Sequence, residues 1–196
     1  MGDIAEQKAA LRRTLRAQRA ARDDAGRADA AARLAGHAAA LPARTLAAFV
    51  GTKAEPPTLP LLGALRDGGH TVLLPVLRGD MDLEWAAFES ADALRPARLG
   101  LLEPTGPSLG LDGVRGAELV LAPALAVDRA GRRLGQGGGS YDRALERSDA
   151  PVVAIVFDEE VLDEPIPVES HDRPVAGVLT PRDGLRWLGG APPAQR

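Results

Sequence analysis

Residues 131–143 combine four glycines within five positions with arginines on both sides and a Tyr-Asp pair after the glycines. Good helix formers follow from Tyr141 onward, so the stretch predicts a glycine-rich loop that runs into a helix. Glycines let backbone N–H groups approach an anion, and the first N–H groups of a helix have no intrahelical partner. Arginines suit a phosphate, and a carboxylate one turn later suits a metal ion on that phosphate. A tight turn between a strand and a helix remains the simpler interpretation of the glycines alone.

A second set of charged residues lies near the N-terminus, where residues 3–22 are predicted to form a helix with Leu11 and Leu15 on one face. Basic side chains follow along this helix at spacings of four, four and three residues, at Lys8, Arg12, Arg16 and Arg19. Such spacing places them in one stripe on the helix surface. The stripe is either a solvated face or a surface that lies over an anionic ligand.

The elements that must position these residues alternate between helices and strands. The other predicted helices are residues 25–41, 58–67 and 141–147, and the predicted strands are residues 45–50, 70–75, 82–89, 118–122, 151–157 and 175–180. Residues 95–115 are predicted to be a long connection rich in Gly and Pro, and residues 123–133 a loop. This order predicts a three-layer α/β/α domain with a mainly parallel, mixed sheet and the N-terminal helices packed over the site. Ligands bind such sheets beyond the carboxyl ends of the strands.

Length and composition describe an ordinary globular chain. Its 196 residues are 45% hydrophobic and carry a net charge of −3, and we expect one domain over residues 1–190 with a disordered tail over 191–196. There is no cysteine, which excludes disulfides and thiolate chemistry. The longest apolar run, Leu119–Val127, is about half as long as a membrane span, and the charged N-terminal stretch lacks the apolar run expected of a signal peptide. A cytoplasmic protein is therefore expected.

Two other functions compete with a phosphate site. Gly135–Ser140 nearly matches the dinucleotide fingerprint G-x-G-x-x-G/A, and Asp158 is placed like the acid that binds the ribose. That fingerprint directly follows its strand, however, whereas residues 123–134 intervene here. A nucleic-acid binder would use the basic helix, but the net charge is negative and aromatic residues are only 3% of the chain. Neither lysine has the spacing of a Walker A loop.

Longer motifs carry a resemblance to a known family. The segment Leu-Ala-Pro-Ala-Leu-Ala-Val-Asp over residues 121–128, followed by Gly-x-Arg-Leu-Gly-x-Gly-Gly-Gly-x-Tyr-Asp-Arg over residues 131–143, resembles the signature of 5-formyltetrahydrofolate cyclo-ligases, also called methenyltetrahydrofolate synthetases. Further similar segments are Lys8-x-x-x-Arg12 and residues 99–104, 165–172 and 178–180. The resemblance covers roughly residues 6 to 182.

The resemblance implies an enzyme that uses ATP to cyclise 5-formyltetrahydrofolate to 5,10-methenyltetrahydrofolate, with release of ADP and phosphate. The formyl oxygen would take the γ-phosphoryl group, and N10 would then attack the activated carbon. Catalysis of this kind rests on positioning and charge neutralisation. The expected partners are these two small molecules with Mg²⁺ as cofactor, and we expect a monomer that binds no nucleic acid and no membrane.

The resemblance also implies the residues of the site. ATP would be bound by Lys8, Arg12, Arg133, Leu134, Gly135, Gln136, Gly137, Gly138, Gly139, Ser140 and Tyr141. The folate would be bound by Val50, Glu55, Gln136, Gly137, Gly138, Gly139 and Ser140, with the Glu55 carboxylate suited to two N–H groups of the pterin. Arg133 and Tyr141 would be catalytic, and Asp142 and Asp172 would bind Mg²⁺.

Ser140 departs from the family pattern, since the family usually has Tyr or Phe at this position. The serine predicts a gap beside the folate, unless another aromatic residue such as Phe49 or Trp85 fills it.

Overall fold

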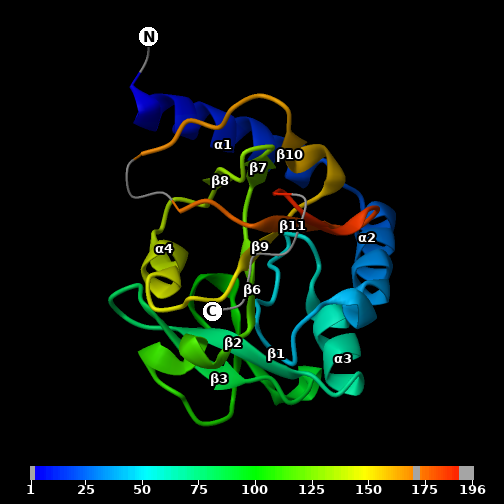
Figure 1. Ribbon diagram of the computed structural model, residues 1–196. Helices are drawn as coiled ribbons and strands as arrows, with labels where there is room; N and C mark the ends of the chain where they lie inside the picture. Colours follow the sequence, from blue (N-terminus) through cyan, green and yellow to red (C-terminus); the bar gives the residue numbers. More distant parts are fainter. Residues whose placement is uncertain (1–2, 170–172, 190–196) are drawn as a thin grey trace.

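A twisted sheet of seven strands runs through the centre of the computed structural model, which describes residues 3–169 and 173–189 (Figure 1). In spatial order the strands are β12 (Gly184–Trp187), β11 (Gly177–Thr180), β9 (Val152–Ile155), β6 (Leu119–Pro123), β1 (Thr45–Ala47), β2 (Thr71–Leu77) and β3 (Leu83–Ala87). The five inner strands pair in parallel, and the two edge strands pair antiparallel to their neighbours. The predicted mainly parallel, mixed sheet is confirmed.

Helices cover both faces of this sheet, as Figure 1 shows. The helices are α1 (Ile4–Ala20), α2 (Asp24–Gly36), α3 (Leu59–Asp67) and α4 (Ser140–Leu145), and the shorter 3₁₀ turns are η1 (Ala38–Ala40), η2 (Ala91–Ala93), η3 (Arg98–Gly100), η4 (Leu111–Gly116) and η5 (Asp158–Glu160). The side chains of β6 alternate between two cores: Leu119 and Leu121 pack with α2 and α3, whereas Val120 and Ala122 pack with α4 and η4. This period of two is what a strand buried on both faces requires.

A second, three-stranded sheet lies beside α1 and is formed by β7 (Ala126–Asp128), β8 (Arg133–Leu134) and β10 (Val161–Leu162). Leu15 of α1 packs in one core with Leu125, Leu134 and Ile166, which explains why Leu11 and Leu15 share a helix face. The N-terminal helix therefore packs against the middle and C-terminal parts of the chain.

The buried carboxylate of Asp128 ties this second sheet together. It accepts hydrogen bonds from the amides of Ala130, Arg132 and Ile166 and from Nε of Arg132, at 2.6 to 3.0 Å. Burial alone would raise the pKa of Asp128, but the hydrogen bonds from Ile166, Arg132 and Ala130 outweigh it and lower the pKa. Asp128 is thus a structural carboxylate that stays ionised in the folded protein.

Two predicted connections contain short strands, and the prediction was wrong there. Residues 95–115 include the hairpin of β4 (Leu94–Pro96) and β5 (Leu102–Pro104), and residues 123–133 include β7 and the start of β8. These strands are two or three residues long, so they show no periodicity along the sequence. The expected disordered tail over 191–196 lies outside the described residues. Within the described part of the chain, no helix has the length and apolar character that crossing a membrane requires.

Candidate active site

A pocket of about 490 Å³ lies beyond the carboxyl ends of three neighbouring parallel strands. Val50 follows β1, Leu77 ends β2, and Pro123 ends β6, and all three line the pocket. Strands that run in parallel bring these ends to one edge of the sheet, where α/β proteins bind ligands. The same pocket is lined by the whole stretch from Gly135 to Asp142.

One wall of the pocket is apolar. Its side chains come from the ends of β1 and β2, the turn before β3, and the β4–β5 hairpin, namely Phe49, Val50, Pro75, Leu77, Met81, Leu83, Leu99, Leu101 and Leu102. Leu99 at the hairpin tip is 70% exposed. An apolar wall with a few polar groups opposite is typical of a site for a flat organic ligand.

The glycine loop forms the opposite side. Gly137 and Gly139 have φ angles of 103° and 69°, in the left-handed region that favours glycine. Within the described residues, the amides of Gly135–Ser140 donate no hydrogen bond. Gly135, Gly139 and Ser140 are part-buried, and residues 136–138 are exposed, so these N–H groups are accessible to a ligand. A run of accessible backbone N–H groups before a helix suits an anion.

Basic side chains of α1 hold the carbonyl side of this loop. Arg12 Nε donates to the oxygen of Gly135 at 2.9 Å, and Arg16 Nη2 donates to the oxygen of Gln136 at 2.9 Å. Lys8 is buried and its Nζ lies 2.8 Å from Oε2 of Glu169. Lys8 is buried and Arg12 is part-buried, whereas Arg16 is exposed, so the basic stripe is only partly a solvated face. Lys8 and Arg12 are not among the described residues that line the pocket; Arg12 contacts the loop from α1.

Arg19, the last basic residue of the stripe, binds buried groups in the protein interior. Its guanidinium makes a bidentate ion pair with Glu160 at 2.6 and 2.8 Å and donates to the carbonyl of Ala124. Burial raises the pKa of Glu160, and the Arg19 charge opposes this shift. Arg19 fixes α1 against the second sheet and does not reach the pocket.

Arg133 and Asp142 are paired at the pocket floor. Arg133 is buried; its Nη1 donates to the carbonyl of Pro123 at 3.2 Å, and its Nη2 donates to Oδ1 of Asp142. Its Nε has no hydrogen-bond partner among the described residues. The guanidinium thus carries a positive charge and a free N–H at the place where the loop meets α4. Such a group can neutralise charge on a transferred phosphoryl group.

The hydroxyl of Tyr141 is buried and has no hydrogen-bond partner in the described structure. Burial raises the pKa of Tyr141, the nearby Glu55 carboxylate raises it further, and Arg133 opposes them. The hydroxyl is therefore a neutral donor at physiological pH. A buried donor without a partner, on the wall of a pocket, is suited to a ligand oxygen.

Glu55 lies on the same pocket, on a loop that is held in place by several hydrogen bonds. Its side chain is buried, and Oε2 accepts from the amide and the hydroxyl of Thr52, both at 3.0 Å. Arg27 of α2 donates to the carbonyl of Glu55 at 3.2 Å. A methyl group at Gly51 would lie 2.1 Å from the carbonyl oxygen of Pro56, so only glycine fits in this loop. The structure brings Val50 and Glu55 together with Tyr141 and the glycine loop.

The expected metal ligands are only partly described. Asp142 lines the pocket with 34% of its side chain exposed, whereas Asp172 lies outside the described residues. No cluster of three or more possible metal ligands occurs within residues 3–169 and 173–189. Mg²⁺ commonly binds one or two carboxylates together with substrate phosphates. Of the described residues at the pocket, Asp142 offers a carboxylate that suits such an ion, and this carboxylate also pairs with Arg133.

Other predicted residues lie away from the pocket. Asp158 accepts from the amide of Arg182 at 3.1 Å and lines a separate cavity of about 240 Å³, so it does not join the glycine loop as a dinucleotide site requires. Trp85 is fully buried in the core that includes α4, whereas Phe49 lines the pocket.

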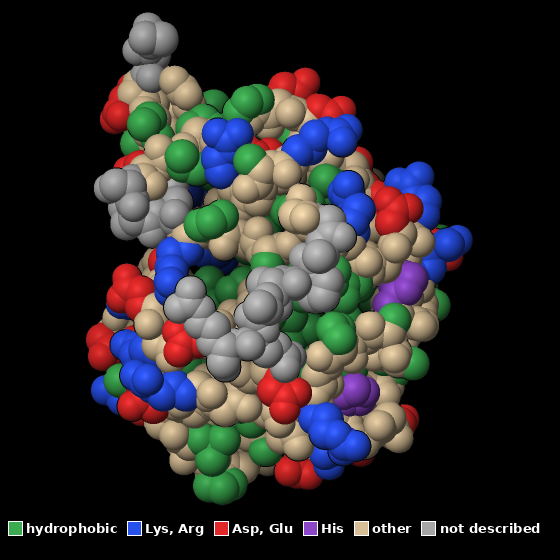
Figure 2. Space-filling view, viewed as in Figure 1, with side chains coloured by type: hydrophobic (Ala, Val, Ile, Leu, Met, Phe, Trp, Pro, Cys, Tyr) green, Lys and Arg blue, Asp and Glu red, His purple; other side chains and the backbone are tan. Residues whose placement is uncertain are grey.

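On the face seen in Figure 2, basic and acidic side chains alternate, which does not favour a nucleic-acid surface there.

Sequence reasoning missed part of the apolar wall. Met81 gave no signal, because it lies in a turn between two strands. The hairpin residues Leu99, Leu101 and Leu102 fall in a segment that resembles the family, but no role was inferred for them.

Comparison with known proteins gives consistent results. Residues 4–181 match the model of the 5-formyltetrahydrofolate cyclo-ligase family. A 5-formyltetrahydrofolate cyclo-ligase from Mycolicibacterium smegmatis is 44% identical over 149 residues, covering 72% of this chain and 76% of the relative. The enzyme of that name from Escherichia coli is 30% identical over 163 residues, covering 81% and 89%. The solved structure of 5,10-methenyltetrahydrofolate synthetase from Aquifex aeolicus has a similar fold, with a TM-score of 0.80, 23% identity and 96% of each chain covered.

Proposed function

Because the chain belongs to the 5-formyltetrahydrofolate cyclo-ligase family, we propose that its pocket and glycine loop bind 5-formyltetrahydrofolate and ATP side by side. The reaction is the ATP-dependent closure of 5-formyltetrahydrofolate to 5,10-methenyltetrahydrofolate, with ADP and phosphate as the other products. The observation that carries this proposal is the loop itself. Arginines of α1 hold its carbonyls, its amides have no partner in the described structure, and it lines an apolar pocket.

The phosphates of ATP lie against the amides of the glycine loop in this proposal. Arg12 fixes the loop from α1, and Lys8 adds positive charge on the same side. Arg133 neutralises charge on the γ-phosphoryl group during transfer, because its buried Nε has no partner within residues 3–169 and 173–189. Asp142, together with Asp172, would hold Mg²⁺, which supplies further neutralisation of the phosphates when it is bound.

The folate occupies the apolar part of the pocket. Glu55 accepts hydrogen bonds from the amino-pyrimidinone edge of the pterin, and Val50 contacts the ring. The hydroxyl of Tyr141 donates to the oxygen that is being phosphorylated, since it is a buried neutral donor between Glu55 and Arg133. Binding in this position brings the formyl oxygen to the glycine loop.

The chemistry then follows two steps. The formyl oxygen attacks the γ-phosphorus and ADP leaves; N10 attacks the activated carbon and loses its proton, and phosphate leaves with the former formyl oxygen. The pocket wall excludes water, which would otherwise compete with N10 for the activated carbon. The site is built from one chain, and we propose that the enzyme acts as a monomer, which sedimentation velocity would test.

The test is the ultraviolet absorbance of the methenyl product formed from 5-formyltetrahydrofolate by the purified protein. Product is expected with Mg-ATP, with one ADP released per product, and none is expected when ATP is omitted or replaced by an analogue with a non-hydrolysable γ-phosphate. Absence of product with Mg-ATP, or equal product without it, would refute the proposal.

A further inference from the structure

The turn between β2 and β3, residues 78–82, reaches the pocket through one residue. Met81 lines the pocket and has a φ angle of 66°, in the left-handed region that residues other than glycine rarely adopt. Such a conformation persists only when the surrounding structure determines it. Within the turn, the amide of Met81 donates to the oxygen of Arg78 at 3.2 Å, which is a weak restraint.

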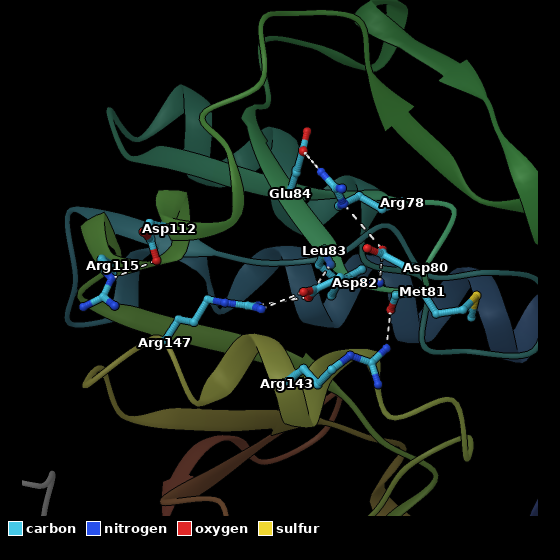
Figure 3. Close-up of polar contacts among 10 residues, drawn as sticks. All are labelled: Arg78, Asp80, Met81, Asp82, Leu83, Glu84, Asp112, Arg115, Arg143 and Arg147. Atoms are coloured by element: carbon cyan, nitrogen blue, oxygen red, sulfur yellow. Dashed lines mark hydrogen bonds and ion pairs between the residues drawn. The ribbon is translucent and has the colours of Figure 1, made fainter.

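Stronger restraints come from α4, which follows the glycine loop directly. Arg143 Nη2 donates to the carbonyl oxygen of Met81 at 2.7 Å. Arg147, just beyond α4, makes a bidentate ion pair with Asp82, with Nη1–Oδ1 and Nη2–Oδ2 distances of 2.9 and 2.6 Å. Figure 3 shows Arg143 extending from α4, and Arg147 from just beyond it, toward the turn, one to each of two consecutive residues.

The ion pair between Arg147 and Asp82 is largely shielded from solvent, unlike the exposed pair between Arg115 and Asp112. The Asp82 and Arg147 side chains are 13% and 24% exposed, whereas those of Asp112 and Arg115 are 70% and 63% exposed. The hydrogen bonds from Arg147 lower the pKa of Asp82, against the opposing effect of burial. A planar, bidentate arginine–carboxylate pair fixes orientation as well as distance.

The turn and the glycine loop meet at one edge of the pocket. A methyl group at Gly138 would lie 3.9 Å from Cε of Met81, and one at Gly139 would lie 3.3 Å from Nη1 of Arg143. Arg143 and Arg147 therefore join α4, which follows the loop, to the turn that carries Met81. A change in this connection alters the position of Met81 relative to the loop and to the rest of the pocket wall.

We propose that Arg143 and Arg147 are positioning residues that hold Met81 at a fixed distance from the glycine loop, and that this distance sets the affinity for the folate. This inference rests on the proposed function and assigns it two residues that touch neither substrate. Arg147 acts through Asp82, and Arg143 acts through the backbone of Met81 itself. ATP, bound at the loop amides, depends less on the connection.

The test compares Arg147→Ala and Asp82→Asn with the control Arg115→Ala, which breaks an exposed pair on η4. Initial rates give kcat and the two KM values, and thermal unfolding reports the fold. The KM for 5-formyltetrahydrofolate is expected to rise about tenfold in Arg147→Ala and in Asp82→Asn, whereas kcat and the KM for ATP stay within about twofold of the wild-type values. Arg115→Ala should behave as the wild type. Asp82→Asn keeps the size of the side chain, so it serves if Arg147→Ala does not fold.

A double-mutant cycle with Met81→Ala shows whether the Arg147–Asp82 pair acts through Met81. If it does, Arg147→Ala added to Met81→Ala changes the folate KM by less than about twofold, because the wall is already lost. Two results would overturn the inference: a folate KM that stays constant while stability or kcat falls, or independent, multiplying effects of the two substitutions.

Failure of this inference is distinguishable from failure of the proposed function. The wild-type protein must form methenyl product with Mg-ATP; if it does not, the proposed function fails. Direct titration of the wild type and Arg147→Ala with 5-formyltetrahydrofolate in a calorimeter, without ATP, measures folate binding alone. If the two proteins have equal dissociation constants for the folate and the wild type is active, only the positioning role of Arg147 is rejected.

Discussion

Replacing Tyr141 by phenylalanine removes one oxygen atom that has no hydrogen-bond partner in the described structure. Leaving a buried polar group unpaired costs about 1–3 kcal/mol. The Tyr141→Phe variant should therefore be as stable as the wild type or more stable, by up to about 1 kcal/mol. For a chain of this length, that gain corresponds to about 2–4 °C in Tm.

Activity should change in the opposite direction. If the hydroxyl donates to the former formyl oxygen as that oxygen leaves with phosphate and gains negative charge, the lost hydrogen bond is worth about 1.5–3 kcal/mol. The value of kcat/KM should then fall about 10- to 150-fold. Because burial raises the pKa of Tyr141 above its ordinary value near 10, the hydroxyl stays protonated below that pH. The pH profiles of wild type and variant should run in parallel between pH 7 and 9.

Urea unfolding monitored by tryptophan fluorescence gives the stability change, and the methenyl absorbance assay gives kcat and both KM values. The reasoning is refuted if Tyr141→Phe is destabilised by more than about 1 kcal/mol, since the hydroxyl would then have a partner in the free protein. Unchanged kcat/KM in a well-folded variant would show that the hydroxyl does not meet the substrate.

Four further substitutions test other parts of the site and the fold. Arg12→Ala should raise the KM for ATP about ten- to hundredfold by releasing the loop carbonyl, whereas the neighbouring exposed Arg13→Ala should not; equal effects would indicate general electrostatics. Asp142→Asn should lower turnover by about 10² at limiting Mg²⁺, and near-normal activity of the folded variant there would remove Asp142 from the metal site. Ser140→Tyr should lower the folate KM about three- to tenfold in steady-state kinetics and leave the ATP KM unchanged; a higher folate KM would mean that the space is already filled. Asp128→Asn should lower the free energy of unfolding at pH 7 by about 2–3 kcal/mol. Because the folded pKa of Asp128 is lowered, its contribution is present above about pH 4 and is lost as pH falls, so urea unfolding should show a shallower acid dependence for the variant.

The glycine loop could be predicted because its signal is local. A run of glycines followed by good helix formers predicts a loop and a helix from neighbouring residues alone, and in the structure α4 starts at Ser140, one residue before the predicted start. The contact of Arg12 with the loop could be anticipated only as one of two alternatives, because the spacing of a stripe does not say what covers it.

The apolar wall could not be predicted in the same way. Leu99 and Leu102 reach the pocket from a hairpin whose strands have three residues each, too short for a periodic pattern. Met81 reaches it through a left-handed turn conformation that its residue type disfavours, and that conformation depends on Arg143, 62 residues later in the sequence. Contacts of this range are properties of the fold and not of a window of sequence.

The packing of α1 has a consequence for protein synthesis. Its basic side chains bind Gly135, Ala124 and Glu160, which follow their partners by 123, 105 and 141 positions. At a translation rate of about 5–20 residues per second, α1 waits roughly 5–30 s before these partners are made. During that interval the guanidinium groups of Arg12 and Arg19 are hydrated and the glycine loop has not yet been made. The first helix of the chain is therefore among the later elements to dock, because its partners extend to Glu160.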